Sequence, residues 1–340
     1  MPTLAETLTW LVDIPSVTGD EGVLRDAIAD RLATTPQQNI SRSLVVGDPD
    51  AGKILLVGHL DTVPLQGHVG ARVEGDRLYG LGATDMKGGL AVMIHLIEDL
   101  GPDRVACVFY AGEEGPIAGN DLGLILEEAP WLKEATAAFV MEPTNREIHY
   151  GCQGAVNARV SFEGTAAHSA RPWLGENAVT KSAGFLAAMA EIEPELHVVG
   201  GIEFNEVVSI TRASGGVANN IIPAEFAMNV NYRFAPDRSV EEAVERLRQI
   251  CSAADRFEVS DLAPAGTVES DHPLFTELLN LTGAEVGGKQ GWTDVSQMSA
   301  AGVPAVNFGP GETALAHKPG ESVRLDDLDW VYGSLTALLG

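Results

Sequence analysis

The most informative stretch of this 340-residue chain is Gly58-His59-Leu60-Asp61-Thr62-Val63-Pro64. It directly follows the apolar run Ile54-Leu55-Leu56-Val57, which predicts a buried strand. Side chains alternate along a strand, so His59 and Asp61 can point in the same direction at its end. Imidazole is a common metal ligand, and a neighbouring carboxylate can orient it. A single pair of this kind is weak evidence, so its meaning depends on the ends of the other predicted strands.

Acidic residues follow two further predicted strands. Apolar runs at 105–111 and 137–141 indicate buried strands, and they are followed by Glu113 and Glu114 and by Glu142, respectively. A helix is predicted from residue 85 to residue 100, after a turn-rich segment at 67–82. Buried strands that alternate with helices indicate a largely parallel sheet covered on both faces. Because ligands bind beyond the carboxyl ends of such strands, we expect these side chains to gather at one edge.

The pattern changes near Gly154, where apolar and polar residues begin to alternate. We expect strands at 156–162, 207–213, 225–234 and 257–262, and helices at 177–192 and behind the capping box at 239–242. This βαββαβ order predicts a ferredoxin-like domain with one helix-covered face. The chain is therefore expected to form one α/β catalytic domain, residues 1–153 plus 264–340, interrupted by an inserted α+β domain at 154–263.

The composition argues against two classes of partner. The chain has 48 acidic and 22 basic residues, a formal net charge of −26, which disfavours binding to nucleic acid and to anionic membranes. We find no basic leader and no run of about 18 apolar residues, so a cytoplasmic location is expected. The three cysteines, Cys107, Cys152 and Cys251, lack CxxC spacing and imply neither a disulfide framework nor a zinc knuckle.

Two imidazoles and three carboxylates stand at predicted strand ends and loops: His59, Asp85, Glu114, Glu142 and His317. This ligand mixture suits zinc or cobalt. The positive charge of two divalent ions would be balanced by the negative charges of the three carboxylates and one bridging hydroxide. The set therefore favours a pair of ions that share ligands. Glu113 stands beside Glu114, and adjacent carboxylates repel each other unless one binds metal while the other serves as a general base.

The chain resembles the two-metal aminoacylase/carboxypeptidase family over nearly its whole length. The motifs that carry the resemblance occur in the same order: Gly58-His59-Leu60-Asp61-Thr62-Val63-Pro64, Gly80-Leu81-Gly82-Ala83-Thr84-Asp85-Met86-Lys87-Gly88-Gly89, Gly112-Glu113-Glu114-Gly115, Glu142-Pro143-Thr144 and Ala316-His317-Lys318. One departure is Leu81, where the family more often has arginine.

The resemblance implies a role for each of these residues. Asp85 would bridge two divalent ions, most simply Zn²⁺ with Co²⁺ as the alternative. His59 and Glu142 would hold one ion, and Glu114 and His317 the other. Glu113 matches the family's general base and acid, and Asp61 the carboxylate that orients His59.

Three residues of the inserted domain match the family's substrate-binding positions. His168, in the segment 164–172, resembles a histidine that reaches the active site of the partner subunit, which implies a homodimer formed through this domain. Asn220 lies in a matching Asn-x-Ile-Pro turn. Arg233 is a candidate carboxylate clamp, because its planar fork suits bidentate pairing. Each residue has an alternative interpretation. His168 could be a turn histidine without function, Asn220 could belong to a hairpin turn without substrate contact, and Arg233 could be a solvated strand arginine.

The segments Gly291-Trp292-Thr293-Asp294 and Asn307-Phe308-Gly309-Pro310-Gly311 most resemble the desuccinylases of this family. That resemblance implies hydrolysis of N-succinyl-LL-2,6-diaminopimelate to succinate and LL-diaminopimelate, in lysine and diaminopimelate biosynthesis. Acetylornithine deacetylase and a carboxypeptidase or dipeptidase are the alternatives within the family. A non-catalytic binding protein is the alternative from another class, and Glu113 argues against it, since a binder needs no free base beside metals.

Overall fold

The computed structural model describes residues 2–51, 54–64, 67 and 70–340. The chain folds as two compact units. Unit 1 comprises Met1–Gly151, Gly266–Lys289 and Thr293–Gly340, and unit 2 comprises Cys152–Ala265 and Gln290–Trp292. None of the described helices is long and apolar enough to cross a membrane.

Unit 1 is built on an eight-stranded sheet. Across the sheet its strands are β1 (Gln37–Ile40), β2 (Ser43–Val46), β6 (Val105–Tyr110), β3 (Ile54–His59), β7 (Ala137–Pro143), β15 (Ala305–Gly309), β8 (Ile148–Cys152) and β14 (Val286–Lys289). The central pairs β6–β3, β3–β7 and β7–β15 are parallel, whereas β1–β2, β2–β6 and β15–β8 are antiparallel. The predicted α/β fold with a mostly parallel central sheet is confirmed.

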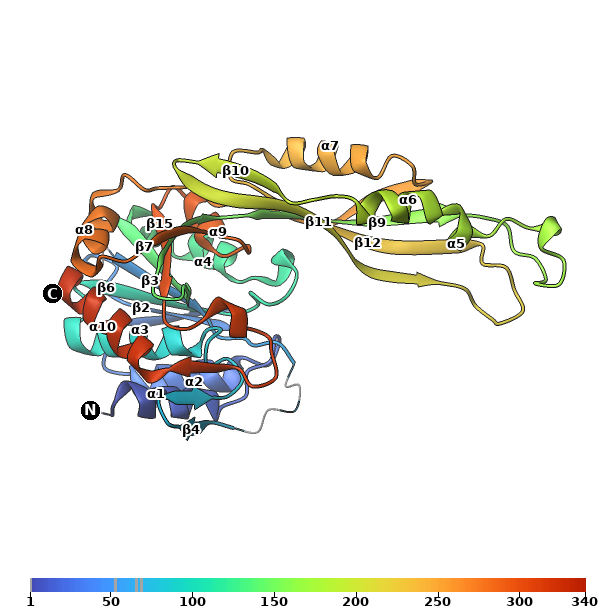
Figure 1. The fold of residues 1–340 in the computed structure, drawn as a ribbon. Coiled ribbons are helices and arrows are strands. Elements are labelled where there is room, and N and C mark those ends of the chain that lie inside the picture. The colour runs from blue at the N-terminus through green and yellow to red at the C-terminus, as the bar shows by residue number, and fades with distance from the viewer. Residues whose placement is uncertain (1, 52–53, 65–66, 68–69) are drawn as a thin grey trace. The chain divides into compact units, whose positions relative to one another are not determined.

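Helices cover this sheet. They are α1 (Leu4–Val12), α2 (Gly22–Arg31), α3 (Lys87–Leu100), α4 (Leu122–Glu128), α8 (Pro273–Thr282), α9 (Val295–Ala300) and α10 (Leu325–Leu339), with 3₁₀ turns at Ile117–Gly119, Pro130–Glu134 and Thr313–Leu315. Helix α3 packs against β3, β6 and β7, and α1 and α10 pack against α3 (Figure 1). The core strands are buried along their length, because both faces of the sheet are covered.

The buried Lys87 joins α3 to the end of α1. Its ammonium donates hydrogen bonds to the carbonyl oxygens of Leu11, at 3.0 Å, and Ile14, at 2.7 Å. Burial lowers the pKa of Lys87 to about 7. A lysine that satisfies the last carbonyls of a helix acts as a cap, so Lys87 has a structural role beside the Asp85 loop.

The predicted turn-rich segment 67–82 contains two short strands. β4 (Arg72–Glu74) and β5 (Arg77–Tyr79) form a hairpin, and β16 (Ser322–Arg324) pairs with β5. Strands of three residues are too short to show an alternating pattern, so the sequence could not separate them from turns.

Unit 2 is a five-stranded antiparallel sheet with helices on one face (Figure 1). Its strands are, in order across the sheet, β10 (Glu195–Val199), β11 (Ile202–Gly215), β12 (Glu225–Phe234), β9 (Gly154–Glu163) and β13 (Arg256–Ala263). The helices are α5 (Ala178–Lys181), α6 (Ala183–Ala190) and α7 (Val240–Ile250), with a 3₁₀ turn at Pro172–Leu174. The core between sheet and helices includes every second residue of β9 and β12, among them Val160 and Tyr232.

Two features of unit 2 differ from the sequence-based expectation. The helix expected at 177–192 is interrupted at Ser182, which ends α5 and precedes α6. Strand β10 was not expected, because it has no buried residue and hence no hydrophobic signal. The capping box before α7 is confirmed, since Ser239 and Glu242 bond reciprocally.

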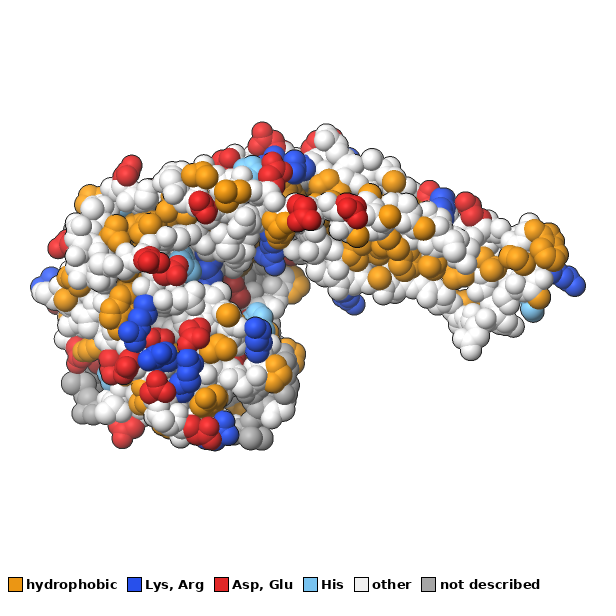
Figure 2. All heavy atoms as spheres, viewed as in Figure 1, with side chains coloured by type: hydrophobic (Ala, Val, Ile, Leu, Met, Phe, Trp, Pro, Cys, Tyr) orange, Lys and Arg blue, Asp and Glu red, His pale blue; other side chains and the backbone are white. Residues whose placement is uncertain are grey.

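Large hydrophobic side chains remain on the surface of unit 2 (Figure 2). Trp173 is 75% exposed, Leu174 63% and Val217 84%. Trp173 and Leu174 follow the loop that carries His168, and Val217 precedes Asn220. Exposed apolar residues in neighbouring loops are typical of a surface that a partner covers.

Candidate metal centre

Asp85 lies between the two histidines of the predicted metal site. It precedes α3, and its Oδ1 is 3.1 Å from Nε2 of His59, the last residue of β3. Its Oδ2 is 3.3 Å from Nε2 of His317. One carboxylate thus presents one oxygen to each imidazole, which is the arrangement that a ligand shared by two ions requires.

Each of the two remaining predicted ligands lies near a different histidine. Glu142, near the end of β7, places Oε1 3.6 Å from His59 Nε2. Glu114 places Oε1 2.8 Å from His317 Nε2. The structure therefore brings all five predicted ligands together, with one glutamate near each histidine and a common aspartate in contact with both histidines.

The donor set fits divalent cations. His59, Asp85 and Glu114 each offer one ligand atom, and these atoms lie within 4.8 Å of one another. Hydrogen bonds with Asp85 and Glu114 raise the pKa of His317 to about 10. Burial opposes a charge on His59, but the hydrogen bond with Asp85 and nearby carboxylates raise its pKa above the ordinary value. Positive charge is therefore strongly favoured here, and metal ions would supply it while the imidazoles bind them as neutral ligands.

The Asp61 carboxylate holds the loop that carries the glutamates. Its two oxygens accept the backbone N–H groups of residues 112–114 at 2.9–3.1 Å, and Oδ2 accepts the Thr18 hydroxyl at 3.0 Å. The Nδ1 atom of His59 lies 2.9 Å from the carbonyl oxygen of Asp61 and 3.7 Å from its carboxylate. His59 is therefore oriented mainly by the backbone of Asp61, while the side chain positions Glu113 and Glu114.

Glu113 lies in this loop beside the ligand cluster. Burial raises the pKa of Glu113 well above its ordinary value, and the neighbouring Glu142 and Asp294 raise it further, against the opposing effect of His59. A carboxyl group whose pKa is raised holds a proton more readily, which suits it to accept a proton and return it. Glu113 therefore combines a position next to the ligand cluster with a raised pKa, the two properties that the predicted general base and acid needs.

Two buried residues of the site were not singled out from the sequence. Lys289, the last residue of β14, places Nζ 3.2 Å from Glu142 Oε2. The Glu321 carboxylate accepts backbone N–H groups from Gly82 at 3.1 Å and from Thr84 at 3.0 Å, and the N–H of Asp85 at 3.1 Å. Neither residue belongs to a recognisable metal-binding or catalytic sequence motif, so only their contacts in the folded structure identify them.

His168 and Asn220 lie on neighbouring loops of unit 2. His168 forms a β-bridge with Ile221, and the N–H of Ser169 donates to the Asn220 carbonyl oxygen at 2.9 Å. Both residues are exposed. The structure therefore brings these two predicted substrate-binding residues together.

Arg233 lies at the other end of the same sheet. On β12 it pairs with Ala155 of β9, close to the point where the chain enters unit 2 at Cys152. Its Nε donates to Asn231 Oδ1 at 3.1 Å. The loops of His168 and Asn220 adjoin the opposite end of β12, which is ten residues long, or about 30 Å. The three predicted residues therefore do not form one cluster within unit 2.

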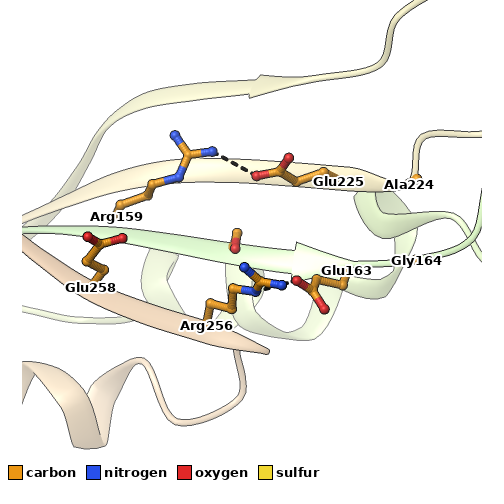
Figure 3. A pocket seen from close by; sticks show the side chains of 8 residues that line it. Arg159, Glu163, Gly164, Ala224, Glu225, Arg256 and Glu258 are labelled. Carbon is orange, nitrogen blue, oxygen red and sulfur yellow. Dashed lines mark hydrogen bonds and ion pairs between the residues drawn. The ribbon is translucent and has the colours of Figure 1, made fainter.

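A separate hollow lies on the open face of the unit 2 sheet (Figure 3). Arg159 pairs with Glu225 at 2.7 Å, and Arg256 pairs with Glu163. Because each arginine already faces a carboxylate, this hollow does not present free positive charge to an anionic substrate. It is therefore a weaker candidate than the cluster around Asp85.

Comparison with known proteins finds one family model and several relatives that match most of the chain. The family described as peptidase family M20/M25/M40 matches residues 55–339. A Mycobacterium tuberculosis protein, provisionally named a succinyl-diaminopimelate desuccinylase, is 38% identical over 348 residues, with 98% of this chain and 97% of the relative covered. The succinyl-diaminopimelate desuccinylase of Corynebacterium glutamicum is 36% identical over 335 residues, with 94% and 91% covered.

Solved structures share the fold. A metallo-carboxypeptidase of the M20 family from Sulfolobus solfataricus has a TM-score of 0.76 at 16% identity and covers 100% of this chain and 99% of its own. A Bacillus subtilis protein, described as a dinuclear metal binding peptidase from the M20 family, has a TM-score of 0.68 at 15% identity, with 99% and 96% covered. At these identities the likeness shows the fold alone.

Proposed function

The chain belongs to peptidase family M20/M25/M40, and on that premise we propose that it is a metal-dependent amide hydrolase acting on N-succinyl-LL-2,6-diaminopimelate. The products are succinate and LL-2,6-diaminopimelate, a step of lysine and diaminopimelate biosynthesis, for which we expect a cytoplasmic location. The observation that carries the proposal is Glu113 with its raised pKa next to a cluster in which Asp85 contacts both histidines and each histidine also lies near a glutamate.

Five residues would hold two divalent ions. His59 and Glu142 would hold one, Glu114 and His317 the other, and Asp85 both. We propose Zn²⁺, with Co²⁺ as the alternative, because the set combines imidazole and carboxylate ligands. Bound ions lower the pKa of coordinated water and polarise the amide carbonyl.

Glu113 is the proposed general base and acid. Its carboxylate takes a proton from the attacking water and later delivers it to the departing amine. The backbone N–H of Glu113 donates a hydrogen bond to the Asp61 carboxylate at 3.1 Å, and this bond holds the loop that carries Glu113. Arg233 is the proposed clamp for a substrate carboxylate, and Asn231 holds its Nε.

We further propose that His168 and Asn220 act on the partner subunit of a homodimer. They adjoin one end of β12, whereas Arg233 lies at the other, near the crossing into unit 1. The exposed Trp173, Leu174 and Val217 support a covered surface at these loops. The strand order β11-β12-β9-β13, with helices on one face, supports a ferredoxin-like lid and dimerisation domain. A histidine brought to the neighbouring site would help to bind the developing oxyanion.

A side-by-side assay tests the proposed substrate. Zinc-loaded protein is given N-succinyl-LL-2,6-diaminopimelate, N-acetylornithine and a dipeptide at equal concentrations, with Glu113→Gln protein as the control for contaminating hydrolases. We expect the highest kcat/KM with the succinylated substrate. A higher value for N-acetylornithine or the dipeptide would assign the chain to another activity of the same family.

A further inference from the structure

Lys289 is a buried cation in contact with one of the proposed metal ligands. Its Nζ lies 3.2 Å from Glu142 Oε2 and 3.0 Å from the carbonyl oxygen of Pro143, and the residue is 5% exposed. Both partners belong to the end of β7. Lys289 is the last residue of β14, so its side chain connects the end of β14 to the end of β7. The motif-based site does not include this residue.

The two oxygens of Glu142 therefore have different environments. Oε1 faces the cluster, 3.6 Å from His59 Nε2, whereas Oε2 accepts from the Lys289 ammonium. An ammonium group only donates hydrogen bonds, and charge-assisted bonds to a carboxylate are strong. Lys289 thus competes for the oxygen through which Glu142 could bind the same ion a second time.

The positive charge of Lys289 also has an electrostatic effect. A cation next to Glu142 neutralises part of its negative charge and repels a metal ion held by the same carboxylate. In a buried site this repulsion is weakly screened. Charge alone therefore predicts that Lys289 lowers the affinity of the site for the metal. Residues that hydrogen-bond to a metal ligand usually raise this affinity instead.

We propose that Lys289 is a positioning residue that restricts Glu142 to one oxygen for the metal, and that it lowers metal affinity in favour of turnover. Catalytic metal sites keep a coordination position open for water or substrate. A lysine that prevents the second oxygen from binding helps to keep such a position free. This inference rests on the proposed function, because it assumes that Glu142 is a metal ligand.

The test compares Lys289→Met and Lys289→Arg with the unaltered protein. Lys181→Met is the matched control, because Lys181 also contacts a carboxylate, Asp255 at 2.9 Å, and a backbone carbonyl, that of Glu163 at 2.9 Å, within unit 2. Two quantities are measured on zinc-loaded protein: the rate of zinc transfer to a chelator, and kcat with KM for the succinylated substrate. Thermal unfolding establishes that each variant is folded, and Lys289→Gln replaces Lys289→Met if the latter does not fold.

We expect Lys289→Met to release zinc more slowly than the unaltered protein while its kcat falls about tenfold. Lys289→Arg, which keeps the charge, should restore release toward the unaltered rate, and Lys181→Met should change neither quantity. Faster zinc release from Lys289→Met would show that Lys289 merely supports the site, and unchanged release with unchanged kcat would show that it has no role. Either result overturns the inference.

The two proposals fail in different ways. If the unaltered protein binds no zinc, or binds it without hydrolysing an amide substrate, the proposed function itself fails. If the unaltered protein binds zinc and hydrolyses the substrate while Lys289→Met behaves identically, only the inference on Lys289 fails.

Discussion

Single residues of the centre differ in how readily the sequence identifies them. The ligands and Glu113 stand next to apolar strands or in recognisable motifs, and the structure brings them together. Glu321 follows His317 closely in the chain but has no motif, although its carboxylate binds three N–H groups of the Asp85 loop. A contact that depends on one side chain meeting a distant backbone leaves no periodic signal, so only the fold reveals it.

Glu113→Gln gives the sharpest test at the residue scale. The substitution preserves the shape of the side chain but removes its ability to take a proton. We expect kcat to fall by about 10²–10⁴ while the zinc content stays the same. Metal analysis and steady-state kinetics on the same preparation provide the measurement. Near-normal turnover in a zinc-loaded variant would remove Glu113 from the proposed mechanism.

His95 gives a pH prediction away from the metal centre. Burial lowers the pKa of His95, and nearby Arg31 lowers it further, while its Nε2 lies 2.8 Å from the Thr7 hydroxyl oxygen. The unfolded chain therefore binds this proton more readily than the folded one, so stability falls as the pH drops below the ordinary value of about 6.5. His95→Gln should flatten this part of the dependence in denaturant unfolding measured from about pH 5 to about pH 8. An unchanged slope would contradict the assignment.

At the scale of elements, the sequence predicted those strands whose buried side chains form a continuous or alternating apolar pattern. Strands such as β6 and β12 are continuous or alternating apolar segments, and both were expected close to their observed bounds. β10 and β4 are short and have no buried residue, so backbone pairing rather than side-chain burial determines them. Such elements carry no hydrophobic signal.

The Asp61-anchored loop supplies the prediction at this scale. Asp61→Ala removes the acceptor for three backbone N–H groups and the Thr18 hydroxyl, and should lower the free energy of unfolding by about 3 kcal/mol. Thr18→Val removes one of these bonds and should cost about 1 kcal/mol. Denaturant unfolding of metal-free protein measures both, so that lost metal binding does not contribute. Equal losses would show that the carboxylate does not anchor the loop.

At the scale of the whole molecule, the centre joins segments far apart in the chain. His59, Glu142 and His317 come from three distant parts of unit 1. We predict two zinc ions per chain, because five ligands exceed the four of a single tetrahedral site. Metal analysis after reconstitution and desalting should give close to two, and chelation should lower the unfolding temperature, since metals that bind the folded state stabilise it. A stable ratio near one would contradict the paired site.

Mixed dimers test the proposed assembly. Glu113→Gln and His168→Ala chains should each be nearly inactive as homodimers, because each site lacks either its own Glu113 or the His168 of the partner. A mixed dimer contains one site with both residues and one site with neither, so mixing the two proteins should restore activity once subunits exchange. The mixed fraction is measured by mass, and activity should rise in proportion to it. A Glu113→Gln protein mixed with a Glu113→Gln, His168→Ala double variant is the matched control and should stay inactive. Persistently inactive mixtures, with exchange verified, would show that His168 does not act across the dimer.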